Sequence, residues 1–170
     1  MDPEHLGRLI DQHAQALELY AKQWCELPED VVQEAFVKLS TQASPPNDPP
    51  SWLFRVVRNA AINASVAARR RRRHETIAAK HCDWFESDQD PSAAVLIDPA
   101  AAEAELRALP IDQREVIVAR LWGGLSFEQI ASLANCSSSS AHRLYHSGLK
   151  ALRERLGVPC HTNKTPQSLD

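Results

Sequence analysis

The sequence has few of the residues that mark several common protein classes. Its 170 residues include only five glycines, and aromatic residues make up 6%. So few glycines leave little material for the turns of a β-sandwich or β-barrel. The cysteines, Cys25, Cys82, Cys136 and Cys160, lie far apart and form no CxxC pair, which argues against a disulfide framework and favours a cytoplasmic location. No apolar run approaches the ~20 residues of a membrane-spanning helix, so no membrane insertion is expected.

Signatures of catalysis and of cofactor binding are also missing. The sequence contains no phosphate-binding glycine loop, no dinucleotide fingerprint and no nucleophile elbow. His74, His81 and Cys82 lack the two-residue ligand spacing that is typical of a zinc site. We therefore expect a protein that is not an enzyme and that binds no metal and no cofactor.

What the sequence does contain is charge in alternating blocks. The whole chain has a net charge of −3, but residues 1–50 carry −6, 51–80 carry +7, 81–112 carry −7 and 113–170 carry +3. Two cationic segments separated by an acidic one predict two surfaces that can contact phosphate.

Apolar residues recur at helical spacing along most of the chain, which predicts an all-α fold. The expected helices cover about 3–25, 27–39, 51–74, 100–109, 112–122, 126–134 and 138–156. The periodicity fails over residues 81–99, an acidic, proline-bounded stretch that we interpret as a flexible linker. This interpretation divides the chain into two small helical domains, 1–80 and 100–157, followed by a mobile tail over 158–170.

Two of the expected helices begin with the pattern of a capping box. In this motif an N-cap side chain and a side chain three residues later each bond the other's backbone N–H. Asp112 with Glu115 has this spacing, and so has Ser126 with Gln129.

The strongest local pattern is that of a helix-turn-helix over residues 127–145. Ile130 and Ala131 would face inward, and Asn135 stands where the turn needs a residue that tolerates a positive φ. The outward face of the last helix carries Ser139, Ser140, His142, Arg143, His146, Ser147 and Lys150. These side chains can donate hydrogen bonds to phosphates or base edges, although an ordinary antiparallel helix pair would have a similar pattern.

The helix over 51–74 is the second candidate for nucleic-acid contact. One arc of it is apolar, and the opposite arc carries Arg55, Arg58, Asn59 and Asn63, with Trp52 at its margin. A run of five arginines follows: Arg69, Arg70, Arg71, Arg72 and Arg73. Cations beside amides and a tryptophan suit a melted or single-stranded nucleic acid, while a solvated arginine-rich helix end with Trp52 in the core is the open alternative.

The third candidate surface is acidic and lies on the helix that starts near residue 28. Its outward residues are Glu29, Asp30, Gln33 and Glu34. A carboxylate cluster can serve acid–base catalysis or hold half a metal site, but no histidine lies at ligand spacing within this helix. A face that docks a basic partner is the preferred interpretation.

In this order, the segments resemble a bacterial RNA polymerase sigma factor of the extracytoplasmic-function type, over about residues 6–156. Residues 29–39 resemble the polymerase-docking helix of the family's region two. Residues 51–61 with the arginine run resemble the promoter-melting and −10-reading segment. Residues 109–116 and 125–131 resemble region four, which reads the −35 element.

The resemblance implies a transcription initiation factor with core RNA polymerase and promoter DNA as partners. The acidic face would contact the clamp helices of the polymerase's largest subunit. The arginine run would lie near upstream phosphates, and the residues near the −10 strand would be Trp52, Arg55, Arg58, Asn59 and Asn63. The polar face of the last helix would read the −35 element, with His146 and its neighbours standing where more arginines are usual. An anti-sigma factor is left open as a further partner. The alternative class is a stand-alone helix-turn-helix regulator, which would explain the last helix but not the acidic face.

Overall fold

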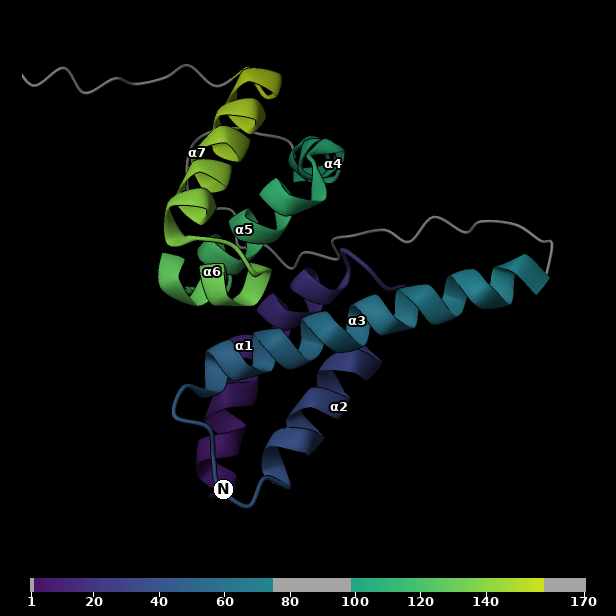
Figure 1. Ribbon diagram of the computed structural model, residues 1–170, viewed down its shortest axis with the longest axis vertical. Coiled ribbons are helices and arrows are strands. Elements are labelled where there is room, and N and C mark those ends of the chain that lie inside the picture. Colours follow the sequence, from purple (N-terminus) through teal and green to yellow (C-terminus); the bar gives the residue numbers. More distant parts are fainter. Residues whose placement is uncertain (1, 75–98, 158–170) are drawn as a thin grey trace, which may run out of the picture.

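The computed structural model describes residues 2–74 and 99–157 (Figure 1). Within these residues the backbone forms seven α-helices and no strand. They are α1 (Pro3–Ala21), α2 (Pro28–Ser40), α3 (Pro49–His74), α4 (Pro99–Ala108), α5 (Ile111–Leu121), α6 (Phe127–Ala134) and α7 (Ser138–Arg155). The all-α prediction is confirmed, whereas most of the expected linker and all of the expected tail lie outside the described residues. No helix in the described part is long and apolar enough to span a membrane.

The first three helices pack around the apolar faces that their spacing predicts. In α2 the predicted inward residues are all buried, namely Val31, Val32, Ala35, Phe36 and Leu39. Pro28 occupies the first turn of α2, where its missing N–H costs no hydrogen bond. The main difference from the expected boundaries is at the end of α1, which stops at Ala21 rather than Cys25, because a turn returns the backbone N–H groups of Trp24 and Cys25 to the Ala21 carbonyl.

The last three helices form the predicted helix-turn-helix and a supporting helix. The capping box of α6 is present: the Gln129 N–H donates to Ser126 Oγ at 3.2 Å, and the Ser126 N–H donates to Gln129 Oε1 at 2.6 Å. Asn135 adopts the left-handed conformation, with φ 53° and ψ 49°, as the turn requires. At Gly148, α7 approaches α5 so closely that a Cβ would lie 2.7 Å from Ile117 Cδ1.

The helices of residues 2–74 and of residues 99–157 share a packed interface. Helix α3 packs against α1 and α2 and also against α6, while α5 packs directly against α1 (Figure 1). Phe54 is fully buried there, and a Cβ on Gly123 would lie 2.6 Å from its Cζ atom. The Gln129 amide donates to Asp48 Oδ2 across the same interface at 2.6 Å.

Candidate polymerase and nucleic-acid interfaces

The acidic face of α2 is exposed along its length. Glu29, Asp30, Gln33 and Glu34 are all exposed, while the opposite side of the helix is buried in the core. The acids at its start lie near the positive end of the helix dipole, which favours them there. Glu34 also pairs with Lys38 at 2.7 Å on the surface. Among the described residues, no group of three or more His, Cys, Asp or Glu side chains could hold a metal ion. The four side chains thus form one exposed acidic face on α2.

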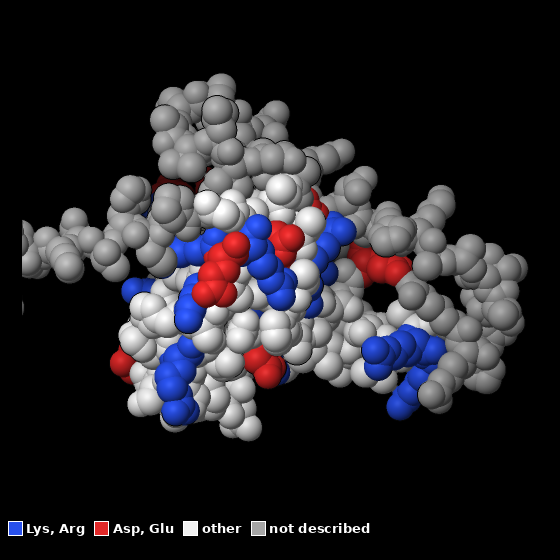
Figure 2. All heavy atoms as spheres, turned by 90° about the horizontal axis from the view of Figure 1, so that it is seen from above, with Lys and Arg blue, Asp and Glu red and all other residues white. Residues whose placement is uncertain are grey.

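One stripe of α3 is open to solvent as predicted. Arg55, Asn59 and Asn63 are exposed and follow each other at one-turn intervals. Arg69, Arg70 and Arg71 are exposed near the end of the helix, and the side chains of Arg72 and Arg73 lie outside the described part. Figure 2 looks down on the last helices, where basic and acidic side chains are mixed, and it shows a separate basic group toward the end of α3.

Arg58 and, at the margin of the stripe, Trp52 are only partly exposed. Trp52 is half-buried and packs against the core. Arg58 is half-buried as well, and its Nε atom donates to Glu115 Oε1 at 2.6 Å, with Nη2 3.4 Å from Oε2. The Arg58 guanidinium also lies 6.0 Å from the centre of the Trp24 ring. The expectation that Arg58 faces outward is corrected, because a carboxylate from α5 pairs with it.

Glu115 is the centre of a buried polar cluster. Its side chain is 4% exposed, and the Tyr20 hydroxyl donates to the same Oε1 atom at 2.6 Å. Burial, followed by the Glu115 charge, raises the pKa of Tyr20 well above its ordinary value. The hydrogen bond to Glu115 raises the pKa of Arg58, so the guanidinium stays charged. The buried carboxylate thus has a cation and a hydroxyl as partners, which is what a buried charge requires.

The predicted capping role of Glu115 is wrong. Helix α5 starts after Pro110 and has no side-chain cap. Glu115 lies on the same face as Val118 and Ala119, which are both fully buried, and so points to α1 and α3. That apolar face was the sequence signal that could have identified Glu115 as a buried acid.

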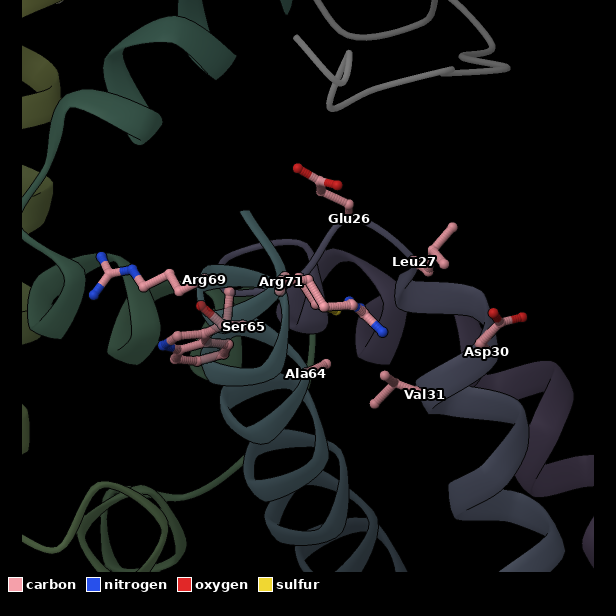
Figure 3. Close-up of a pocket in the computed structure, with 11 residues that line it drawn as sticks. Glu26, Leu27, Asp30, Val31, Ala64, Ser65, Arg69 and Arg71 are labelled. Atoms are coloured by element: carbon pink, nitrogen blue, oxygen red, sulfur yellow. The ribbon is translucent and has the colours of Figure 1, made fainter. Parts of the chain in front are cut away.

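A pocket of about 320 Å³ lies between the start of α2 and the last turns of α3 (Figure 3). Its lining includes Asp30 from the acidic face and Arg69 and Arg71 from the arginine run. In Figure 3 the Arg71 side chain reaches from α3 toward α2, whereas Arg69 points away. Burial raises the pKa of the Cys25 thiol in this pocket, which disfavours the thiolate that a nucleophile needs. The acidic and basic candidate surfaces therefore adjoin at this pocket.

The outward face of α7 is a continuous polar stripe. The exposed members are Ser139, His142, Arg143, His146, Ser147 and Lys150, and Ser140 is half-buried. Ser137 caps the helix by accepting from the Ser140 N–H at 3.1 Å. Arg143 donates to Ser140 Oγ at 3.1 Å, and the Nε2 atoms of His142 and His146 are 3.1 Å apart. In the part of the chain that the structure describes, the side-chain contacts of this stripe lie within α6 and α7, unlike those of the α3 face.

Comparison with known families identifies both halves of the chain. Residues 9–74 match the family described as Sigma-70 region 2, and residues 100–152 match Sigma-70, region 4. The RNA polymerase sigma-H factor of Pseudomonas aeruginosa is 32% identical over 119 residues, which are 64% of this chain and 62% of that protein. The ECF RNA polymerase sigma-E factor of Escherichia coli K12 is 32% identical over 118 residues, or 63% and 62% of the two chains.

Two further relatives extend the match. RNA polymerase sigma factor CarQ of Myxococcus xanthus is 29% identical over 142 residues, covering 77% of this chain and 75% of that protein. A solved structure of the sigma factor RpoE with the anti-sigma factor NepR, from Bartonella quintana, has a similar fold, with a TM-score of 0.66 and 20% identity over 94% of this chain and 100% of that one. With region 2 and region 4 matched in that order, the chain belongs to the sigma-70 family, among sigma factors of the extracytoplasmic-function type.

Proposed function

We propose that this chain is a transcription initiation factor that binds core RNA polymerase and directs it to promoters. The observation that carries the proposal is the separation of exposed charge, with an acidic face on α2 and basic and amide-bearing faces on α3 and α7. These faces occur in the chain order of the matched regions. The factor acts in the cytoplasm alongside polymerase and has no catalytic role of its own.

In this proposal, residues 1–80 bind polymerase and contact the −10 element. The α2 face contacts the clamp helices of the largest subunit. The Arg55–Asn59–Asn63 stripe spans about 12 Å of helix, at 1.5 Å per residue, and offers both amides for base edges and a cation for phosphate. The arginine run neutralises neighbouring phosphates without reading sequence.

Residues 100–157 engage the −35 element. In a helix-turn-helix the second helix enters the major groove, and here that helix is α7. Arg143 can donate two hydrogen bonds to a base edge, and the serines beside it are short enough not to obstruct the groove. Residues 81–99 connect the two units.

Because Arg58 is paired with Glu115, its proposed contact with promoter DNA requires a change of conformation. Arg58 can contact the −10 strand only after α3 separates from α5. Polymerase and promoter binding are therefore expected to favour a separated arrangement. An anti-sigma factor, if this chain has one, is expected to favour an arrangement in which Arg58 stays paired.

The test is a charge reversal on α2. The double variant Asp30→Lys/Glu34→Lys should lose most of its affinity for purified core polymerase, because its two lysines would repel a basic partner surface. The matched control is Glu4→Lys/Asp11→Lys, which changes two exposed acids on α1 by the same charge. Both variants should keep the wild-type circular dichroism spectrum, since exposed changes alter stability by about 0.5 kcal/mol. Equal affinity in the two variants would contradict the docking role, and a wild-type chain that binds no core polymerase would favour the stand-alone regulator.

A further inference from the structure

Helix α7 presents two imidazoles that face each other on the protein surface. His142 and His146 are one turn apart, both are exposed, and their Nε2 atoms are 3.1 Å apart. Two histidines at this spacing on one helix face are the arrangement with which helical zinc sites hold their ion.

The distance between the two nitrogens fits a shared metal ion. Metal–nitrogen bonds to histidine are about 2.0–2.1 Å, so two such bonds at a tetrahedral angle place the nitrogens about 3.3 Å apart, and at a right angle about 2.9 Å apart. The observed 3.1 Å lies between these two values. An ion can therefore bind both rings without movement of the backbone.

Neighbouring aromatic rings hold each imidazole in place. Phe127 contacts His142 edge-on, with ring centroids 5.0 Å apart, and Tyr145 contacts His146 edge-on at 5.3 Å. The nearby cations are engaged elsewhere, since Arg143 donates to Ser140 and Lys150 lies 3.8 Å from Glu154. The two Nε2 atoms share a hydrogen bond in this arrangement, and an ion that binds both displaces its proton.

We propose that His142 and His146 form a bidentate site for a divalent transition-metal ion. Imidazole nitrogen suits Ni²⁺, Cu²⁺ and Zn²⁺, with Cu²⁺ bound most tightly of the three. The described residues bring no cluster of three or more protein ligands together, so water completes the coordination shell. This site stands independently of the proposed role in transcription, because it depends only on the two side chains and the helix that carries them.

The experiment is a Ni²⁺ titration of the untagged, full-length chain by calorimetry. Ni²⁺ is chosen because it prefers imidazole and does not oxidise the free thiols. The variants His142→Gln and His146→Gln should each weaken the Ni²⁺ affinity of this site at least tenfold, since either change turns a chelate into a single ligand. Ni²⁺ should also raise the melting temperature of the wild-type chain and have a smaller effect on that of either variant.

Two matched variants test whether the effect belongs to this pair. His5→Gln removes an exposed histidine from α1, and Cys136→Ser removes the free thiol in the turn before α7; both should keep wild-type Ni²⁺ affinity. In nuclear magnetic resonance spectra, paramagnetic Ni²⁺ should broaden the α7 signals first. The proposal is overturned if the two α7 variants bind Ni²⁺ as the wild type does, if His5→Gln loses as much affinity as they do, or if broadening begins elsewhere.

Discussion

The polar faces of α3 and α7 differ in how their side chains are held. Among the described residues, the side-chain contacts of the α7 face lie within residues 99–157, and none of them involves α1, α2 or α3. The α3 face is divided: Arg55 and its stripe are open, but Arg58 pairs with Glu115 of α5. The α7 face is therefore available in this arrangement, whereas Arg58 joins the open α3 stripe only when the two halves separate.

The largest effect is expected where the two halves share a core. Phe54 is fully buried, packs edge-on against Tyr20, and lies against Gly123. Phe54→Ala should lower the free energy of unfolding by about 3–5 kcal/mol, measured by urea denaturation. The control is Trp122→Ala, since Trp122 is a large aromatic residue that is 44% exposed and should matter by about 0.5 kcal/mol. A decrease below about 1 kcal/mol for Phe54→Ala would show that the shared core contributes little.

The next effect is expected from Glu115, whose loss should unpair Arg58 of the α3 face and leave the α7 face unchanged. Glu115→Ala should lower the free energy of unfolding by about 2–3 kcal/mol, which is less than for a fully buried pair because the Arg58 side chain is 25% exposed. The same variant should increase the radius of gyration in small-angle scattering. Glu105→Ala, which removes the exposed partner of Arg155, should change stability by about 0–1 kcal/mol. Matching scattering curves for Glu115→Ala and wild type would contradict the proposal that this cluster holds the two halves together.

A smaller effect should distinguish base reading from phosphate binding. In holoenzyme, Arg143→Ala should narrow the gap in affinity between cognate and scrambled −35 elements, at the lower end of the about 1–3 kcal/mol range for a base contact. Arg69→Ala/Arg70→Ala should instead weaken both templates alike and flatten the salt dependence by about 0.9 in slope for each phosphate that is no longer neutralised. Binding to both templates across a salt series measures the two quantities. If Arg143→Ala weakens both templates equally, another face of α7 reads the groove.

The smallest effect concerns alkaline pH. The pKa of Tyr20 is raised in the folded state, so above about pH 10 the unfolded chain loses this proton while the folded chain retains it. The stability that this proton provides is complete below about pH 10 and declines as the pH rises toward the folded-state value. Tyr20→Phe should therefore show a flatter fall of melting temperature between about pH 9 and pH 11. A wild-type slope in Tyr20→Phe would place the alkaline effect elsewhere.

Local sequence patterns predicted the features whose partners are local. The apolar face of α2 follows from helical spacing, the Ser126–Gln129 box from residues three apart, and the turn at Asn135 from its tolerance of positive φ. The helix-turn-helix followed because all its parts are close together in the sequence, within residues 127–145.

Features that depend on distant partners were not predictable in the same way. Glu115 bonds Tyr20 across 95 residues and Arg58 across 57, and no periodic pattern links positions that far apart. Glu115 lies three residues after Asp112, which is the spacing of a capping box. In the structure it instead bonds Tyr20 and Arg58 in the buried interface. The spacing of His142 and His146 was visible in the sequence, whereas the approach of their Nε2 atoms depends on side-chain rotamers that the flanking rings select.

Under the conformational requirement proposed above, the Tyr20–Glu115–Arg58 cluster would also set the fraction of free protein that is competent to bind a promoter. When only a fraction of molecules is in the separated arrangement, the apparent dissociation constant rises by the inverse of that fraction. Each increment of about 1.4 kcal/mol by which the paired arrangement is favoured makes competent molecules tenfold rarer. Weakening the cluster should therefore increase promoter engagement by the free chain while it lowers the stability of the fold. Selection for a tightly regulated factor and selection for a highly active one would act on this carboxylate in opposite directions.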